Sequence, residues 1–236
     1  MRSVSFIVPA HNEERLLGST LDALNAAARA IGQPHEVLVV DDASTDRTAA
    51  TARERGARVV SVNLRHISAV RNAGAAASTG DYLIFVDADT LVDQSVVAAA
   101  LRALDGGAVG GGANVRWDGV RPRWARIAEV FTMFWMRVAR LAAGCFIFCT
   151  REAFDAVGGF DERVFASEEL FLSRGLKRQG RFVLLREFVV TSGRKFRTYS
   201  PREMFLMVRA LGWRPWRALR ERERLGLWYG ERRHDE

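Results

Sequence analysis

The segment YLIFVDAD at residues 82–89 decides the fold, because five strand-forming residues run directly into Asp87 and Asp89. A continuous apolar run of this length is typical of a buried strand in a parallel sheet. Ligands of open α/β sheets bind beyond the carboxyl ends of the strands, so we expect both carboxylates at a ligand site. Paired carboxylates there suit a divalent cation that carries a diphosphate. The alternative is an acidic strand end that only caps the next helix, since Asp-x-Asp alone is common.

Strands and helices alternate on both sides of this segment, which predicts βαβ units and a mostly parallel sheet. Apolar runs predict further strands at residues 4–9, 36–40 and 59–62. Helical spacing of apolar residues, with Gly32, Gly56 and Gly80 at the ends, predicts helices over 16–31, 46–56, 68–78 and 94–104. We therefore expect an α/β domain with a mostly parallel sheet that binds its ligand beyond the carboxyl ends of the strands.

Polar motifs stand at the strand ends in a specific order, although each motif alone is weak. They are Pro9-Ala10-His11-Asn12-Glu13, Asp41-Asp42, Arg71-Asn72, Asp87-Ala88-Asp89, Gly158-Gly159-Phe160-Asp161-Glu162 and Ser167-Glu168-Glu169-Leu170. Over roughly the first four-fifths of its length the chain resembles the family 2 glycosyltransferases, inverting nucleotide-sugar enzymes of the GT-A fold. The resemblance implies a Rossmann-like, mostly parallel sheet flanked by helices at residues 1–197, with a helical appendage at residues 198–236.

The resemblance also assigns a nucleotide pocket to residues that follow the first two strands. Pro9, His11, Glu13 and Asp42 would line it, and the Asp42 carboxylate would accept the N–H of a uracil-like base. Arg71 would contact the nucleotide or a phosphate; the alternative for Arg71 is an ordinary surface arginine on a helix. A UDP-sugar is the favoured donor.

The metal and diphosphate site is likewise implied by the resemblance. Asp89 would ligate Mn²⁺ or Mg²⁺ directly, and Asp87 would contact the ribose or a metal-bound water. Arg194 and Lys195 occupy the place of a loop that contacts the diphosphate in relatives. Many relatives carry a histidine ligand nearby, but the histidines of this chain are elsewhere, so the third protein ligand stays open.

The candidate general base belongs to the segment Ser167-Glu168-Glu169-Leu170, where relatives carry Glu-Asp or Asp-Asp before a helix. Position by position, Glu169 takes the place of the family's catalytic aspartate, and Glu168 is the substitute. The alternative is a pair of acids that only stabilises the positive end of a helix dipole.

Composition and charge limit the partners. A chain of 236 residues, nearly half hydrophobic, can bury a full core. Its two cysteines are expected to be core thiols. Neither a signal peptide nor an apolar run of membrane-spanning length is apparent, which predicts a cytoplasmic location.

Residues 194–236 carry a net charge of +6 of the total +7. Because no nucleic-acid motif accompanies this excess, it favours an anionic membrane surface or a diphosphate-bearing lipid.

Two segments have an ambiguous relation to a membrane. The helix expected over residues 123–143 carries an apolar stripe that includes Phe131, Phe134 and Val138. Packing of this stripe on the sheet is the favoured interpretation, whereas exposure of Trp135 and Met136 would indicate a lipid-facing surface. A capping box at residues 200–203 predicts a tail helix. Its tryptophans and arginines are typical either of an interfacial helix or of a solvated helix packed on the body.

These assignments predict a metal-dependent inverting glycosyltransferase, peripheral on the inner face of the plasma membrane, that acts on a hydroxyl acceptor. The acceptor would be lipid-linked or belong to the cell envelope. One alternative is a sugar-phosphate nucleotidyltransferase, which usually has a Gly-rich basic loop after its first strand; residues 9–13 lack one. The other alternative is a non-catalytic protein that binds nucleotide-sugars on the same fold.

Overall fold

The structure is a computed structural model that describes residues 2–119, 123–194 and 198. The predicted tail helix and Lys195 lie outside the described residues, as does the proposed boundary at residue 197. All other residues that we assigned to the site are described.

One mixed sheet forms the centre of the molecule, with strands in the order β3-β2-β1-β4-β7-β6-β8-β5. Strands β1 to β4 pair in parallel, and β6 pairs in parallel with β8; the antiparallel pairs all involve β5 or β7. The predicted mostly parallel sheet is therefore present. The strands are β1 Val4–Ala10, β2 His35–Asp42, β3 Arg58–Val62, β4 Tyr82–Val86, β5 Thr90–Leu91, β6 Gly110–Trp117, β7 Phe146–Thr150 and β8 Phe182–Thr191.

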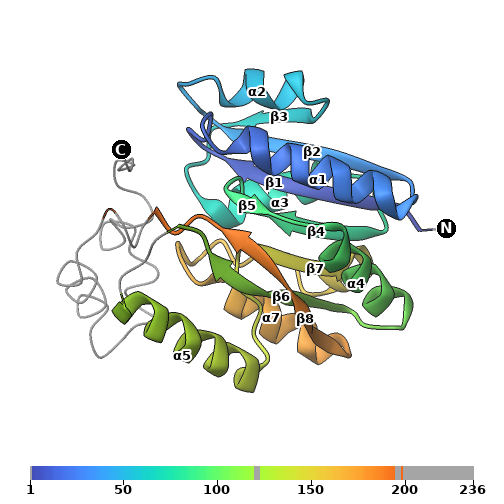
Figure 1. Cartoon of the computed structure of the whole chain (residues 1–236). Helices are drawn as coiled ribbons and strands as arrows, with labels where there is room; N and C mark the ends of the chain where they lie inside the picture. Colours follow the sequence, from blue (N-terminus) through green and yellow to red (C-terminus); the bar gives the residue numbers. More distant parts are fainter. Residues whose placement is uncertain (1, 120–122, 195–197, 199–236) are drawn as a thin grey trace.

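Helices cover both faces of the sheet, and each face has its own core (Figure 1). Alternate side chains of β1 enter opposite cores, with Phe6 packed against α1 and α4 and Ile7 packed against α3. Helices α6 and α7 complete the second core. The helices are α1 Leu17–Ile31, α2 Thr48–Glu54, α3 Ile67–Ala77, α4 Gln94–Asp105, α5 Arg123–Ala139, α6 Arg151–Ala156 and α7 Glu168–Gln179.

Helix α3 lies unusually close to the sheet because Gly74 has no side chain. A Cβ atom at Gly74 would lie 2.4 Å from Cγ2 of Ile7 and 2.8 Å from Cγ2 of Val40. Arg71 stands three residues earlier, on the same face of the helix. The close packing of α3 on β1 and β2 therefore carries the Arg71 side chain beneath the edge of the sheet where β4 ends.

The predicted packing of the α5 stripe on the sheet is wrong for the residues that the structure describes. Phe131, Phe134 and Val138 have 63%, 58% and 60% of their surface exposed, and Trp135 has 52%. Met136 is partly buried. Neither core contains a described α5 side chain, because α6 and α7 already cover the adjoining face of the sheet.

Two further expectations can be checked against the described residues. Cys145 and Cys149 are buried free thiols, as predicted. None of the helices in the described part of the chain is long and apolar enough to cross a bilayer.

Candidate active site

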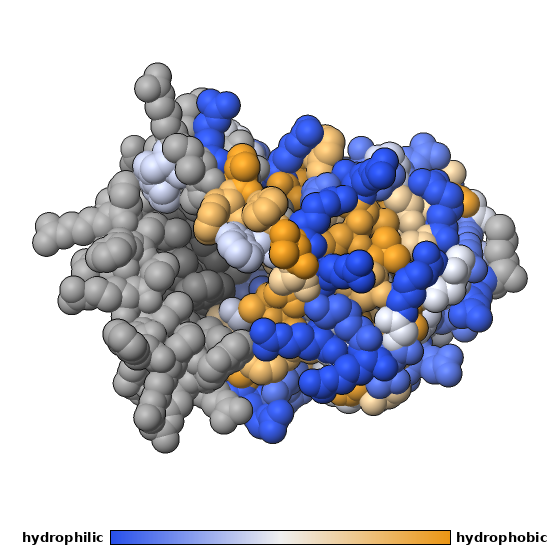
Figure 2. Space-filling view, turned by 90° about the horizontal axis from the view of Figure 1, so that it is seen from below, coloured by the Kyte–Doolittle hydropathy of each residue, from blue (hydrophilic) through white to orange (hydrophobic). Residues whose placement is uncertain are grey.

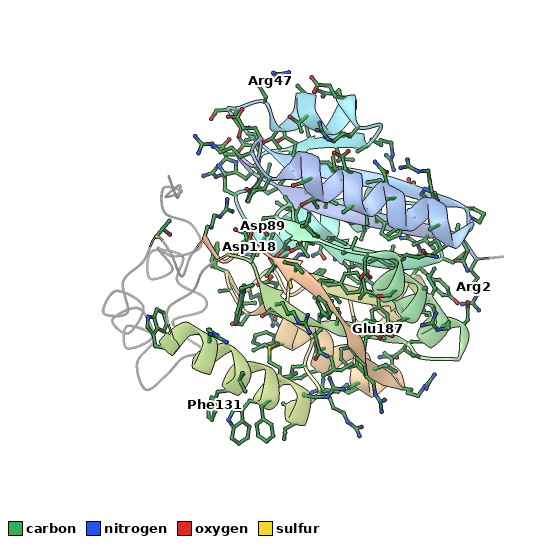
Figure 3. The ribbon with its side chains drawn as sticks, viewed as in Figure 1. Arg2, Arg47, Asp89, Asp118, Phe131 and Glu187 are labelled. Atoms are coloured by element: carbon green, nitrogen blue, oxygen red, sulfur yellow. The ribbon has the colours of Figure 1, made fainter. Side chains whose placement is uncertain are left out.

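The site lies where β1, β2 and β4 end, because the carboxyl ends of parallel strands meet at one edge of a sheet. Glu13 and Asp42 are buried there, with 5% and 6% of their surface exposed. Asp87 and Asp89 follow β4 and are partly accessible; Asp89 is labelled in Figure 3. The structure therefore brings together the acidic residues that the sequence places after three separate strands.

Asp42, one of the residues predicted to bind the nucleotide, ties the loops after β1, β2 and β3 together. Oδ1 of Asp42 accepts hydrogen bonds from the backbone N–H groups of Leu64 (2.7 Å) and Arg65 (3.1 Å). Nδ1 of His11 lies 2.7 Å from the carbonyl oxygen of Asp42, and the Arg65 guanidinium contacts the His11 ring. Asp42 thus positions the loop after β3 as well as facing the site. Arg65, which the sequence did not single out, contacts both Asp42 and His11.

Left-handed backbone conformations are concentrated around these loops. Asn12, Ala43 and Arg65 have φ values of 51°, 52° and 50°, and Ser167, just before α7, has a φ of 62°. Non-glycine residues in this region cost free energy and persist only where the surroundings enforce them. Such conformations cluster at ligand sites, which agrees with the position of the pocket.

Arg71 is the buried centre of the site, with only 2% of its surface exposed. Its Nη2 donates to Oδ1 of Asp87 (2.8 Å) and to the carbonyl oxygen of Gly144 (2.9 Å), and its Nη1 pairs with Glu168. Burial disfavours the charged guanidinium, but Asp87 and Glu168 outweigh this cost and raise the pKa of Arg71. The alternative of a surface arginine is therefore wrong. Arg71 links the strand-end acids to the start of α7.

The two glutamates at the start of α7 have different environments. Glu168 is buried and pairs with Arg71, whereas Glu169 is partly accessible. Burial, and next the neighbouring Glu168 carboxylate, raise the pKa of Glu169 to about 8. Glu169 also lies beside Gly144, since a Cβ atom there would be 3.7 Å from the Glu169 carboxyl carbon. A carboxyl group that is mostly buried but keeps some exposed surface, and whose pKa burial raises, is suited to general-base catalysis.

Arg194 closes the site from the end of β8. Its Nη1 and Nη2 donate to the two carboxylate oxygens of Glu13 at 3.0 and 2.6 Å. Nη2 also lies 3.4 Å from Oδ2 of Asp89. Bidentate pairing of this kind fixes a guanidinium in position. Glu13 and Arg194 are 181 positions apart in the sequence. Their pairing holds the positively charged Arg194 guanidinium next to the Asp89 carboxylate.

The sequence matches the family model described as "Glycosyl transferase family 2" over residues 5–158, which include every strand-end motif of the donor side. This chain belongs to glycosyl transferase family 2. The predicted resemblance is confirmed.

Two relatives of this glycosyltransferase have names that state their chemistry. The chain is 39% identical over 107 residues to the 4,4'-diaponeurosporenoate glycosyltransferase of Staphylococcus haemolyticus, covering 42% of this chain and 28% of that protein. It is 35% identical over 97 residues to the undecaprenyl-phosphate 4-deoxy-4-formamido-L-arabinose transferase of Serratia proteamaculans, covering 38% and 29%. The chain thus spans less than a third of the length of these curated relatives.

Solved structures of similar glycosyltransferases share the fold. The mannosyltransferase of Pyrobaculum calidifontis, in complex with GDP-Man and Mn²⁺, superposes with a TM-score of 0.67 at 19% identity, covering 98% of this chain and 65% of that one. The glucosyl-3-phosphoglycerate synthase of Mycobacterium tuberculosis, in complex with Mn²⁺ and UDP-Glc, gives 0.64 at 22%, covering 95% and 79%. These similarities confirm the predicted GT-A fold.

Asp118 lies close to Asp89 and was not singled out from the sequence. It accepts a hydrogen bond from the N–H of Gly193 (2.7 Å), and its own N–H donates to the carbonyl oxygen of Thr191. It lines one small pocket together with Asp89 (Figure 3). Asp118 therefore fixes the turn that presents Arg194. Asp118 directly follows β6, as Asp87 directly follows β4. The same signal, an acidic residue immediately after a strand, would therefore have identified it.

Asp87 and Asp89 suit a divalent cation that is held partly by the protein and partly by the phosphates of a bound nucleotide. Among the residues that the structure describes, no three His, Cys, Asp or Glu side chains form a cluster able to hold a metal. Asp89 and Asp87 nevertheless offer hard carboxylate oxygens. Mg²⁺ and similar ions bind through one or two carboxylates together with substrate phosphates and waters, so this donor set suffices. The third protein ligand stays open.

The raised pKa of Glu169 predicts the pH dependence of the glycosyltransferase. A protonated carboxyl group cannot accept a proton, so kcat/KM should rise with pH through an apparent pKa of about 8. Stability should change in the opposite direction. The unfolded chain releases this proton near pH 4.5, so the free energy of unfolding should fall as pH rises from 4.5 to about 8.

A pH profile of kcat/KM, which reports on groups of the free enzyme, tests this prediction. The rising limb should disappear in Glu169→Gln. A rising limb that persists in Glu169→Gln would show that Glu169 is not the group that limits the reaction, and a wild-type limb at the ordinary glutamate pKa of ~4.3 would contradict the raised pKa of Glu169.

Proposed function

We propose that this chain is a metal-dependent inverting glycosyltransferase that moves a sugar from a nucleoside-diphosphate sugar to an acceptor hydroxyl. The single observation that supports it best is the Arg71 network. Arg71 pairs with the strand-end carboxylate of Asp87 and with Glu168, the neighbour of Glu169. Gly144 lies next to both Arg71 and Glu169, because a Cβ atom there would be 3.5 Å from Nη2 of Arg71 and 3.7 Å from the carboxyl carbon of Glu169. One side of the site thus suits a leaving diphosphate, and the other suits an incoming hydroxyl.

The chemistry proposed for Glu169 is a single displacement. Glu169 accepts the proton of the acceptor hydroxyl, whose oxygen forms a bond to the anomeric carbon. The bond from that carbon to the diphosphate oxygen breaks, and its electron pair leaves with the nucleoside diphosphate. Because the attack and the departure occur on opposite faces, the anomeric configuration inverts. Arg71 is proposed to position the two acidic segments, since its own guanidinium is occupied by Asp87, Glu168 and Gly144.

The donor is proposed to bind across the ends of β1, β2 and β4. Pro9, His11, Glu13 and Asp42 would hold the nucleotide, with a UDP-sugar favoured. Asp89 and Asp87 would hold Mn²⁺ or Mg²⁺. Bound there, the cation would neutralise charge that develops on the leaving diphosphate. Arg194 would add a second positive charge on the same side, and Lys195 is proposed to do so as well.

A lipid-linked acceptor is the proposed acceptor class. One relative is named for transfer to undecaprenyl-phosphate, which supports this class for the family members of similar sequence. The net charge of +6 on residues 194–236 supports a peripheral position at an anionic membrane surface, on the cytoplasmic side. The described residues contain no nucleic-acid motif, and we propose no nucleic-acid partner.

Donor binding and donor hydrolysis test the proposed function together. A nucleotide-sugar present at 100 times its dissociation constant should stabilise the protein by ~2.7 kcal/mol, which a thermal-shift screen of UDP-, GDP- and dTDP-sugars would detect. Release of the nucleoside diphosphate should then require Mn²⁺ or Mg²⁺. Binding without any turnover in the presence of acceptor lipids would support the non-catalytic alternative.

Replacement of Arg194 should separate metal binding from donor binding. Its guanidinium lies against Asp89, so Arg194→Gln should remove a competing positive charge and tighten Mn²⁺ binding in the absence of donor by roughly 5-fold. The same change should weaken UDP binding in the presence of Mn²⁺ by about 10-fold, since a charged hydrogen bond to the diphosphate is lost.

Electron paramagnetic resonance of free Mn²⁺ measures the first effect, and calorimetry with UDP measures the second. Arg2→Gln serves as the matched control, because Arg2 is an exposed arginine that precedes β1, at the opposite end of the sheet from Asp89 (Figure 3). Unchanged UDP affinity in Arg194→Gln would remove Arg194 from the diphosphate site.

A further inference from the structure

One face of α5 exposes large hydrophobic side chains to which the proposed function assigns no role. Val130, Phe131, Phe134, Trp135 and Val138 have between 52% and 71% of their surface exposed. Their rings contact one another rather than the sheet: the Trp135 ring centroid lies 6.0 Å from that of Phe131 and 5.9 Å from that of Phe134. Phe131 points away from the sheet in Figure 3, and Figure 2 shows hydrophobic residues at the surface on this side of the molecule. We call these five residues the α5 apolar face.

Positive charge borders one flank of the α5 apolar face. Arg126, Arg137 and Arg140 are exposed, and Glu129 is the only acidic residue in the sequence of α5. At the end of the helix Lys177 donates to the carbonyl oxygen of Ala139 (2.8 Å). Burial, and then repulsion from Arg174 and Arg140, lower the pKa of Lys177. Lys177, Arg174 and Arg140 therefore form a cluster of positive charge, and such a cluster attracts an anionic surface.

We propose that the α5 apolar face docks onto an anionic lipid membrane. Clustered aromatic and aliphatic side chains bordered by arginines are the composition of helices that lie in the membrane interface. A soluble protein partner would account for the hydrophobic residues, but a surplus of arginine with a single acid favours anionic headgroups over a mixed protein surface. This surface lies in the catalytic body, so it is distinct from the basic residues of the tail.

The α5 apolar face is joined to the catalytic carboxyl by a short, packed connection. After α5 the chain turns at Arg140, whose φ is 50°. The N–H of Ala142 then donates to Oγ of Ser173 in α7 (3.1 Å), and the carbonyl oxygen of Gly144 accepts from Arg71. Docking of α5 would therefore hold Glu169 at a fixed position relative to the bilayer. Resting on the proposed function, we infer that this delivers the head group of a lipid-linked acceptor to Glu169.

Vesicle flotation with the full-length protein tests the docking. The probes are vesicles of phosphatidylcholine alone and of phosphatidylcholine mixed with phosphatidylglycerol, at low and high salt. Wild-type protein should float with the anionic vesicles and dissociate as salt increases. The apolar variant Phe131→Ser with Trp135→Ser should lose about 10-fold or more in partitioning. The charge variant Arg126→Gln with Arg140→Gln should lose roughly 5-fold per arginine, at low salt only.

A matched variant, Arg47→Gln with Arg53→Gln, removes two exposed arginines, one directly before α2 and one within it; α2 lies on the opposite side of the molecule from α5 (Figure 1). It should float like the wild type. Equal losses in the two arginine variants would mean attraction by net charge alone and would overturn docking at α5.

Two other occupants of the α5 apolar face would give different results, and each would also overturn the proposal. If the chain's own residues 199–236 cover the face, the apolar variant should unfold at a markedly lower temperature and float like the wild type. If a second copy covers it, the variant should change the mass measured in solution and not the flotation. Release of nucleoside diphosphate without vesicles reports on the proposed function separately, and the apolar variant should leave it unchanged. In the wild-type protein, nucleoside diphosphate release without flotation would overturn the docking alone, and flotation without release would overturn the proposed function alone.

Discussion

Replacing Asp89 with asparagine is expected to abolish turnover while leaving the fold intact. Asp89 is the carboxylate at the end of β4 that faces Arg194, and it is only partly accessible. The amide keeps the shape of the side chain but loses the negative charge that a divalent cation requires. Since a bound cation contributes several kcal/mol to the stabilisation of transition-state charge, kcat should fall by about 10³-fold or more.

Asp81→Asn is the matched control for Asp89→Asn. Asp81 is an exposed acid that immediately precedes β4, at the opposite end of the same strand, where it accepts hydrogen bonds from Ser3. It should leave kcat and the Mn²⁺ dependence unchanged. The measurements are steady-state kinetics across a Mn²⁺ titration, with thermal unfolding of each variant as a check on the fold. Metal-dependent turnover that persists in Asp89→Asn would refute the assignment of Asp89 as the metal ligand.

Replacing Glu169 with glutamine is expected to lower kcat by ~10²–10⁴-fold while donor affinity stays nearly unchanged. Glu169 is partly accessible and has a raised pKa, so it is the carboxyl group of this pair that can receive a proton from an acceptor. Glutamine has similar size and polarity but cannot act as a base. The change should therefore affect the chemical step, measured by single-turnover transfer, and not the binding of donor, measured by calorimetry.

Glu168→Gln is the decisive comparison because the two residues are neighbours with different contacts. Glu168 is buried and paired with the Arg71 guanidinium, so its replacement removes one charge from a buried ion pair. Removing one partner of such a pair typically costs ~3–5 kcal/mol, and retention of a hydrogen-bonding amide should reduce this loss. The expected signature is a lower unfolding temperature. If instead Glu168→Gln loses kcat and Glu169→Gln keeps it, the general base is Glu168.

The sequence by itself determined the elements that depend on local pattern. The apolar runs of β1, β2 and β4 predict buried parallel strands, and the polar residues that follow them must meet at one edge because parallel strands end together. This is why Asp42, Asp87 and Asp89 could be assigned to one site without coordinates. The order of these motifs was also enough to identify the family.

Only the tertiary structure decided which of the polar groups contact one another. Arg71 could have been an exposed helix residue, and it became the buried counter-ion of Asp87 and Glu168 because Gly74 lets α3 press against the sheet. Arg194 and Glu13 stand at opposite ends of the chain and meet only through the return of β8 beside β6.

Whether the apolar side chains of α5 are buried or exposed was likewise decided by the tertiary structure. Its spacing of three and four residues predicts a helix with one apolar side, and α5 is such a helix. Periodicity fixes which side chains share a face, because it depends on neighbours along the chain. It does not fix what covers that face, because this depends on which elements have already filled the adjoining sheet. Here α6 and α7 fill it, and Phe131, Phe134 and Val138 are left facing outward.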